Sequence, residues 1–526
     1  MSEPPPRAER AAAPRPTPSP ELVCHPSLPC PSLPSPGREG SGVSEGGAAS
    51  SDHAPLLERA FADEPFEGEL AVERVEGELP GGLAGTYLLA GPARFTAGGV
   101  RYANWLDGDG MVVAASFGNG NGRGPRVRQR FVATSKLTAE RAAGKALFRT
   151  FGTRFDGDRL VHGVAVASPV NLSAWPFAGR LLAFGEQGQP WQLDPETLET
   201  RGPGTFGGTV TAATPFSGHP KVDPATGELV TFGVSFAPHE PTLHLFRFAP
   251  GGALALRTRQ PLPYPASIHD FALGARHAVF HVAPHLLDLE ALRGGSTVLE
   301  ALSWEPERGS RLLVLDRHDG SLVADVAVGN RYCLHLLNAW DERGRLTVDL
   351  LELDRPVYGD YHQLPDLFAD APAGRAVRYV IDLADGDLLT RRTTADLGTP
   401  DFPTLDRRRA TRQNDEGWVL QVSHTGASSR PGRKFFDRLL HVRWDEGRVA
   451  GAWQAPPLTY LAGEPAFAPA SGEGAALVVP LWDAEANRSA LALFDPFDVA
   501  AGPRATVWLS GRMPLGFHSY WSAGAS

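Results

Sequence analysis

The sequence predicts an all-β fold of the propeller type, and three observations indicate it. Short apolar or alternating runs recur along the chain between turns rich in Gly, Pro and Asp, a pattern typical of strands. Helical periodicity is scarce by comparison. The strand-rich part extends over about 470 residues, which is too long for one sandwich or small barrel, whereas about six to eight four-stranded blades would account for it.

The start of the chain has a different composition. The first fifty residues contain 12 of the 47 prolines, and no Phe, Trp or Tyr precedes Phe61. Such a segment buries too little apolar surface to offset the entropy lost on ordering. We therefore expect residues 1–57 to form a disordered, proline-rich tail and residues 58–526 to form a single propeller domain.

The clearest candidate strands are short apolar runs that follow or precede turn residues. They are residues 179–184, 227–232, 311–315 and 475–480. Residues 139–148 are the best candidate for a helix.

Charge and composition exclude several classes of protein. The formal net charge is −10 and the chain has no basic stripe, so a nucleic-acid partner is not expected. Two of the three cysteines lie in the tail, which argues against a disulfide framework and favours a reducing, cytoplasmic compartment. We expect neither a signal peptide nor a transmembrane helix, because the start of the chain lacks an apolar core segment and no run of 18 apolar residues occurs.

Four of the 16 histidines stand out by their neighbours. His219 lies in Ser-Gly-His-Pro-Lys, His269 in Ile-His-Asp-Phe, His335 in Leu-His-Leu-Leu-Asn and His518 in Gly-Phe-His. No pair has the close spacing of a zinc finger or of two ligands on one helix. If they bind a metal, they must converge from distant strands, as a propeller allows because each blade places one strand along the central axis.

The segments between about Val75 and Trp521 resemble those of the carotenoid cleavage oxygenases. Asp-Gly-Asp-Gly-Met at 107–111, Arg-Phe-Val-Ala-Thr at 130–134 and Leu-Leu-Ala-Phe-Gly-Glu at 181–186 are similar to blocks of that family, and the four histidine segments follow in the family's order. The resemblance implies a seven-bladed β-propeller with a cap of helices and loops over an iron site.

The resemblance also implies the metal and its ligands. One Fe(II) per chain would be held by His219, His269, His335 and His518, and the all-nitrogen ligand set leaves positions open for O2 as cosubstrate. Three carboxylates would contact these histidines: Glu186, Asp401 and Glu464. The family has glutamate where this chain has Asp401, and the shorter side chain is expected to need a backbone shift or a bridging water.

The resemblance implies that O2 cleaves a conjugated C=C bond of a carotenoid or apocarotenoid into two carbonyl products. An apolar tunnel should lead to the metal, and the candidate wall residues are Phe271, Trp340, Phe517 and Trp105. Two alternatives stay open, a stilbene-cleaving dioxygenase of the lignostilbene type and a propeller that binds polyenes without cleaving them.

The stilbene alternative would use a lysine and a tyrosine to hold a phenol oxygen, for which Lys136 and Tyr102 are the candidates, although a surface position is expected for Lys136. The expected partner is thus an apolar conjugated small molecule. No protein partner is evident, and peripheral contact with a membrane is left open by the family's habit of placing an apolar patch in lipid.

Overall fold

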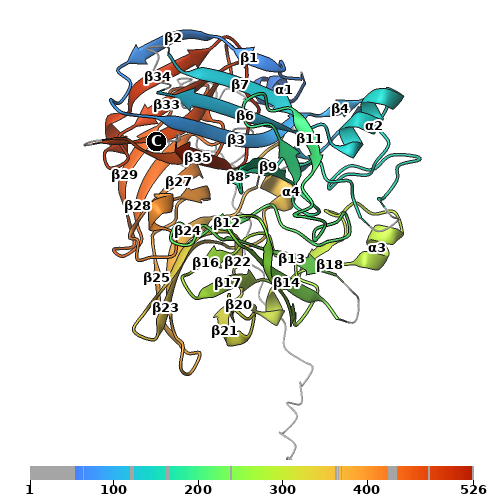
Figure 1. The fold of residues 1–526 in the computed structure, drawn as a ribbon, viewed down its shortest axis with the longest axis vertical. Helices are drawn as coiled ribbons and strands as arrows, with labels where there is room; N and C mark the ends of the chain where they lie inside the picture. Colours follow the sequence, from blue (N-terminus) through green and yellow to red (C-terminus); the bar gives the residue numbers. More distant parts are fainter. Residues whose placement is uncertain are drawn as a thin grey trace, which may run out of the picture. The chain divides into compact units, whose positions relative to one another are not determined.

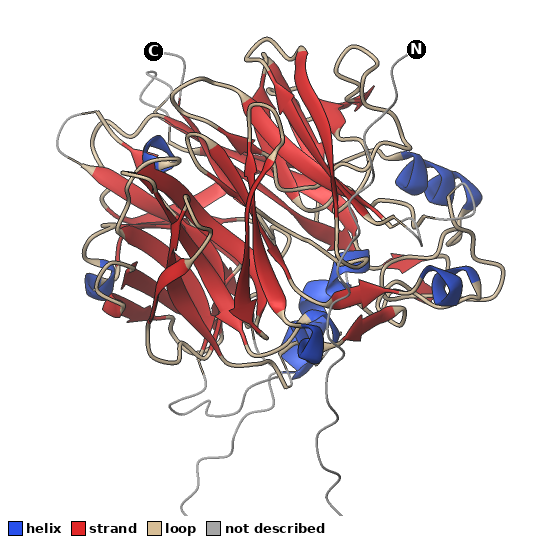
Figure 2. Cartoon of the chain, turned by 90° about the horizontal axis from the view of Figure 1, so that it is seen from below, coloured by secondary structure: helices blue, strands red, loops and turns tan. Residues whose placement is uncertain are grey.

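The computed structural model describes residues 54–523 apart from 63, 119–123, 162–164, 237–239, 362–363, 365, 369, 424–434 and 472–473. Within these residues the strands form seven antiparallel sheets of four to six strands, arranged as a seven-bladed propeller (Figures 1 and 2). The predicted fold class is therefore confirmed. In the described part of the chain, no helix is long and apolar enough to span a membrane.

Blades 1 and 7 join the two ends of the described chain. Blade 1 consists of β1 (Gly68–Leu70), β7 (Arg126–Phe131), β6 (Asp109–Phe117), β3 (Gly85–Arg94) and β35 (Ser519–Ala523). Blade 7 consists of β2 (Val72–Gly77), β34 (Pro503–Leu509), β33 (Arg488–Phe494) and β32 (Ala475–Asp483), with β30 (Thr459–Leu461) and β31 (Ala466–Pro469) both paired to β32. Early and late strands share both sheets, and this pairing closes the ring.

Blades 2 to 6 are each built from consecutive strands, with one pair of cap strands inserted in blade 4. Blade 2 contains β8 (Ser173–Phe177), β9 (Arg180–Phe184), β10 (Trp191–Leu193) and β11 (Thr200–Pro203). Blade 3 contains β12 (Lys221–Val222), β13 (Leu229–Ser235), β14 (Thr242–Phe248) and β15 (Leu254–Pro261). Blade 4 contains β16 (Ala272–Leu273), β17 (His277–Val282), β20 (Ser310–Asp316) and β21 (Leu322–Gly329).

The same order holds in the next two blades. Blade 5 contains β22 (Tyr332–Glu342), β23 (Arg345–Leu353), β24 (Gly374–Asp382) and β25 (Leu388–Thr393). Blade 6 contains β26 (Thr399–Thr404), β27 (Glu416–Val422), β28 (Arg438–Arg443) and β29 (Arg448–Gln454). The end strands β8, β12, β16, β22, β26, β31 and β35 form the inner layer, where β35 contacts β8 and β31, and β22 contacts β16 and β26. The runs expected to be strands fall in β9, β13, β20 and β32, as predicted.

The other elements are short. Two-stranded pairs form between β4 (Thr96–Ala97) and β5 (Val100–Arg101) and between β18 (His285–Leu287) and β19 (Leu302–Trp304). The helices are α1 (Ala54–Ala62), α2 (Ser135–Ala143), α3 (Leu289–Arg293) and α4 (Tyr358–Tyr361), and single 3₁₀ turns occur at Trp105–Asp107, Pro306–Arg308, Arg407–Arg409 and Val499–Ala501.

Two sequence-based boundaries need correction. The expected helix at 139–148 is instead α2, which begins at Ser135 because Thr134 caps it by accepting a hydrogen bond from the Leu137 N–H, and which ends where Gly144 adopts a φ of 63°. Helix α1 begins at Ala54, inside the expected tail of residues 1–57, and Leu57 is fully buried. Residues 1–53 lie outside the described residues, so their expected disorder stays a prediction.

Candidate metal centre

The fold brings the four singled-out histidines to one end of the inner layer. His219 lies two residues before β12, His269 three before β16, and His518 immediately before β35, while His335 is the fourth residue of β22. These inner strands belong to blades 3, 4, 1 and 5. Each histidine therefore lies at or near the start of an inner strand, which explains how residues so far apart in sequence can converge.

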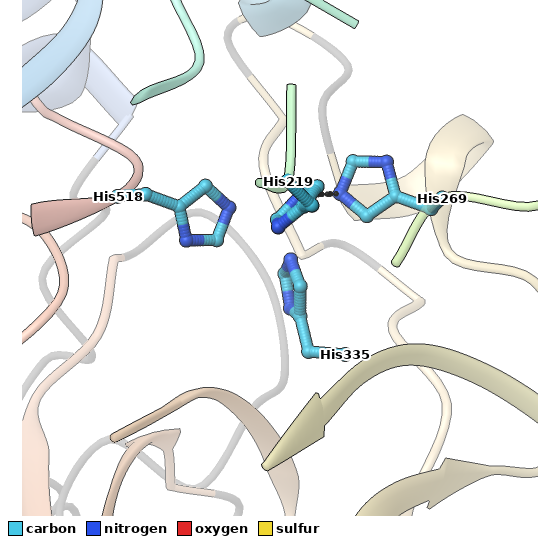
Figure 3. A group of neighbouring side chains, drawn as sticks. All are labelled: His219, His269, His335 and His518. Carbon is cyan, nitrogen blue, oxygen red and sulfur yellow. Dashed lines mark hydrogen bonds between the residues drawn. The ribbon is translucent and has the colours of Figure 1, made fainter. Parts of the chain in front are cut away.

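Their side chains form a compact group around a common point (Figure 3). One ligand atom from each residue can be chosen so that all four lie within 4.8 Å of one another. The Nε2 atoms of His219 and His269 are 2.9 Å apart. All four residues are buried, with at most 8% of their surface exposed. Such a cluster of nitrogen donors has the size and chemistry of a metal site.

The three predicted carboxylates each lie against the outer nitrogen of one histidine. Nδ1 of His269 lies 2.8 Å from Oε2 of Glu186, and Nδ1 of His518 lies 3.5 Å from Oε2 of Glu464. These glutamates follow β9 in blade 2 and precede β31 in blade 7.

The third carboxylate lies on blade 6. Nδ1 of His335 contacts Oδ1 of Asp401 directly, so of the two expected adjustments, a backbone shift or a bridging water, the water is not needed. Asp401 is followed by Phe402, which has an unusual positive φ of 52°. The amide of Phe402 donates a 2.7 Å hydrogen bond to the same Asp401 oxygen. This local backbone conformation directs the short Asp401 carboxylate toward His335.

A fourth carboxylate was missed in the sequence. Oδ1 of Asp270 lies 3.5 Å from Nδ1 of His219 and 2.8 Å from Nζ of Lys221. Its other oxygen accepts a 2.9 Å hydrogen bond from the Leu336 N–H. The signal was present in the His-Asp pair at 269–270, but Asp270 serves the histidine of the neighbouring blade, and only the fold shows that.

The donor set fits a divalent metal ion. An acceptor at Nδ1 keeps the proton on that nitrogen and leaves the Nε2 lone pair for a metal. Burial and the neighbouring His518, His269 and His335 hold the pKa of His219 well below its ordinary value, so its ring is neutral. Nε2 of His335 is buried and has no hydrogen-bond partner among the described residues, which is the state of a nitrogen prepared for a metal.

The aromatic residues expected near the metal divide into two groups. Phe517 directly precedes His518, and its ring centroid lies 4.4 Å from that of Trp105. Phe271 instead packs on Phe232 and Phe280, and the Trp340 ring lies under a guanidinium, that of Arg378. These contacts place neither ring among the histidines, and the role of Phe271 and Trp340 as wall residues stays a prediction.

Two other aromatic residues lie against the group and were not predicted. The ring of Phe402 lies 5.7 Å from that of His335 and 5.3 Å from that of His518. The ring of Tyr358, in α4, lies 6.3 Å from that of His269. Phe402 follows the singled-out Asp401 in sequence, but its contact with two histidines, like the position of Tyr358, is shown only by the fold. The expected tunnel stays a prediction.

Lys136 and Tyr102 lie together in the interior. Only 1% of the Lys136 side chain is exposed, so the expected surface position is wrong. Nζ of Lys136 lies 2.9 Å from the Tyr102 hydroxyl, 2.9 Å from Oδ1 of Asp109 and 3.1 Å from Oε2 of Glu140. Although burial alone would lower the pKa of Lys136, the charge of Asp109 and the other neighbours raise it, so the ammonium stays charged.

Comparison with known proteins agrees with this geometry. The family model described as retinal pigment epithelial membrane protein matches residues 61–523. Isoeugenol monooxygenase of Pseudomonas nitroreducens is 31% identical over 89% of this chain and 98% of its own. Lignostilbene-alpha,beta-dioxygenase isozyme III of Sphingomonas paucimobilis is 29% identical over 87% of this chain and 94% of its own.

A solved structure extends the comparison to the fold. The crystal structure of cobalt-substituted apocarotenoid oxygenase of Synechocystis has a TM-score of 0.81 and 26% identity, and the match covers 90% of this chain and 99% of that one. The family match and the four buried histidines together support an oxygenase with a metal centre on the propeller axis. This chain belongs to the retinal pigment epithelial membrane protein family, that of the carotenoid cleavage oxygenases.

Proposed function

We propose that the protein is an iron(II) oxygenase that cleaves a C=C bond conjugated to a 4-hydroxyphenyl ring. Both atoms of one O2 molecule balance the reaction, because the double bond breaks and each carbon becomes a carbonyl. The four inward-facing histidines carry the proposal. A propeller that only binds a polyene has no need of four buried imidazoles whose ligand atoms lie within 4.8 Å of one another.

Iron(II), when bound, would supply the activation of O2. The protein's own groups orient and protect the site. Glu186, Asp401 and Glu464 fix the ring positions of three histidines, as outer carboxylates do in metal sites. The ring of Phe402, which is 1% exposed, packs against those of His335 and His518 and covers that side of the group with apolar surface.

The Lys136–Tyr102 pair supports a phenolic substrate. A buried, charged lysine beside a tyrosine hydroxyl is a strong hydrogen-bonding site for a phenol or phenolate oxygen. Three residues after Tyr102, the indole of Trp105 packs on Phe517 beside His518. The segment that carries Tyr102 therefore passes next to the metal centre. The names of two relatives, isoeugenol monooxygenase and lignostilbene dioxygenase, also refer to phenols with a conjugated double bond.

The existing hydrogen bonds of Lys136 restrict how a phenolic substrate can bind. Its three protons already have acceptors in Tyr102, Asp109 and Glu140. An entering phenol oxygen must therefore take the place of one of them, and the Tyr102 hydroxyl, itself 3.0 Å from Oε2 of Glu140, is the neutral and most replaceable partner.

A carotenoid or apocarotenoid is the second candidate substrate. The observation that favours it is the match to apocarotenoid oxygenase, which extends over nearly the whole of both chains. A hydrocarbon substrate would leave Lys136 and Tyr102 as a structural pair. The two candidates thus differ in whether this pair touches the substrate.

Turnover of matched substrates separates them. Iron-loaded protein is incubated in air with 4-hydroxystilbene, 4-methoxystilbene or an apocarotenal, and the carbonyl products are identified by mass. We expect cleavage of 4-hydroxystilbene and little of the methyl ether, which cannot donate a hydrogen bond. Lys136→Met should lower kcat/KM for 4-hydroxystilbene by about 10-fold, the effect of one lost hydrogen bond to a charged group, without loss of iron. Cleavage of the apocarotenal alone would favour the second candidate, and no cleavage of any substrate would overturn both.

A further inference from the structure

A second polar cluster lies beside the metal centre, and none of its groups has a part in metal binding. His285 begins β18, and its carbonyl accepts a 2.8 Å hydrogen bond from the Ser267 N–H, two residues before His269. Its ring stacks on that of Tyr358 at 5.8 Å with an interplanar angle of 20°. Tyr358 in turn lies next to His269. The imidazole of His285 is thus one aromatic ring away from a metal-binding histidine.

His285 has an unsatisfied polar atom. The residue is 5% exposed, and its Nδ1 is buried without a hydrogen-bond partner among the described residues. Burial lowers the pKa of His285 to about 4, so the ring is neutral and offers one N–H donor and one acceptor. A buried polar atom without a partner is costly, and its persistence beside a binding site points to a ligand group that completes it.

Tyrosine hydroxyls complete the cluster. The ring of Tyr332 meets that of His285 edge-on at 5.8 Å, and the buried Tyr332 hydroxyl has no hydrogen-bond partner among the described residues. A tyrosine hydroxyl is protonated at neutral pH and is a neutral donor and acceptor. The cluster offers neutral donors and acceptors and no net charge, which suits a hydroxyl group and not a carboxylate.

This cluster and the Lys136–Tyr102 pair approach the metal from different sides. Figure 3 shows His518 and His269 on opposite sides of the histidine group. The segment carrying Tyr102 passes on the His518 side through Trp105 and Phe517, whereas Tyr358 and His285 lie on the His269 side. A substrate anchored at both clusters would place its middle near the metal.

We propose that His285, with Tyr332 and Tyr358, binds a hydroxyl on the far ring of the substrate, so that the preferred substrate is a stilbene with hydroxyls on both rings. The inference rests on the proposed cleavage of 4-hydroxyphenyl alkenes and names their second binding point. His244 and His281 also have buried nitrogens without partners in the described structure, but they lie within β14 and β17, the third strand of blade 3 and the second of blade 4. His281 therefore serves as a matched control.

The test compares kcat/KM for 4,4′-dihydroxystilbene and 4-hydroxystilbene. Wild-type protein should prefer the dihydroxy compound by about 10-fold or more, since a site built to bind a hydroxyl discriminates against an analogue that lacks it. His285→Phe should bring this ratio close to one while cleavage of 4-hydroxystilbene continues. His285→Asn should restore part of the preference, and His281→Phe should leave the ratio unchanged.

The possible results distinguish the second binding point from the proposed cleavage activity. A wild-type protein that cleaves both stilbenes at equal kcat/KM, or a His285→Phe variant that lowers both equally, would overturn the second binding point while the proposed activity stands. A wild-type protein that cleaves neither stilbene would overturn the proposed function and this inference together. The wild-type ratio needs no variant, so it decides the matter even if His285→Phe fails to fold.

Discussion

Oδ1 of Asp401 accepts hydrogen bonds from two groups at once, Nδ1 of His335 and the backbone N–H of Phe402. Burial alone would lower the pKa of His335, but the adjacent Asp401 charge raises it overall. The carboxylate thus holds one imidazole in a fixed orientation, and the Phe402 amide holds the carboxylate. Loss of the Asp401 charge should therefore weaken metal binding.

Asp401→Asn is expected to weaken iron retention by about 10 to 100-fold, as changes of outer partners do in other metal sites. The measurement is iron content after dialysis against a graded series of chelator concentrations. Asp341→Asn is the matched control, because Asp341 contacts Nδ1 of His277 in the same way but far from the metal. Equal loss of iron in both variants would show a general effect of lost His–Asp pairs.

The two glutamates should differ in what they stabilise. The Glu464 side chain is 8% exposed and also accepts a 2.7 Å hydrogen bond from the Ser519 N–H, whereas the Glu186 side chain is 38% exposed. Glu464→Gln should therefore lower both iron retention and the Tm, because Oε2 alone receives the contacts of His518 and Ser519 and the amide lacks the charge that holds them. Glu186→Gln should lower iron retention with little change in Tm. The reverse order of Tm changes would contradict the account of Glu464.

Acid should destabilise the protein through its buried histidines. Burial lowers the pKa of His281 from 6.5 to about 4. Below about pH 6.5 the unfolded chain takes up a proton that the folded protein does not, so stability falls as the pH drops toward 4, by up to about 3 kcal/mol from this residue. His281→Leu should flatten the fall in Tm between pH 7 and 4.5, and the exposed His318→Leu should not. Parallel curves for all three proteins would contradict the prediction.

Helix α1 should be part of the stable fold. Leu57, Ala60 and Phe61 are at most 2% exposed, and the Phe61 ring packs edge-on against Phe95 at 5.1 Å. Phe61→Ala should cost about 3–5 kcal/mol in the free energy of unfolding. Phe66→Ala, at a position that is 65% exposed, should change it by less than about 0.5 kcal/mol. Denaturant unfolding of both variants provides the comparison.

Much of the metal centre could be predicted because its residues lie in short local motifs. His219, His269, His335 and His518 each have characteristic neighbours, and Glu186 and Glu464 were found in the same way. The seven-bladed architecture followed from the family resemblance, since the strand pattern alone allowed a range of blade numbers. These motifs can be recognised from the sequence because each one determines the local structure at the start of one inner strand.

The surroundings of the metal could not be predicted, because they depend on which blades and loops meet. Tyr358 and His285 reach the site from α4 and β18, whose sequences have no distinctive pattern. Phe271 and Trp340 lie in motif segments, but their contacts with Phe232, Phe280 and Arg378 depend on neighbouring strands and are not recorded in the motifs. Lys136 was expected at the surface because its burial depends on Asp109 and Glu140 as charge partners.

The iron content of purified protein tests the central claim most directly. Wild-type protein loaded with Fe(II) without oxygen and freed of excess metal should contain about one iron per chain, in line with one group of four donors. Single alanine substitutions of His219, His269, His335 and His518 should each remove most of it, whereas His277→Ala should not. Full iron occupancy in any of the four variants, or loss of iron in all five, would contradict the account.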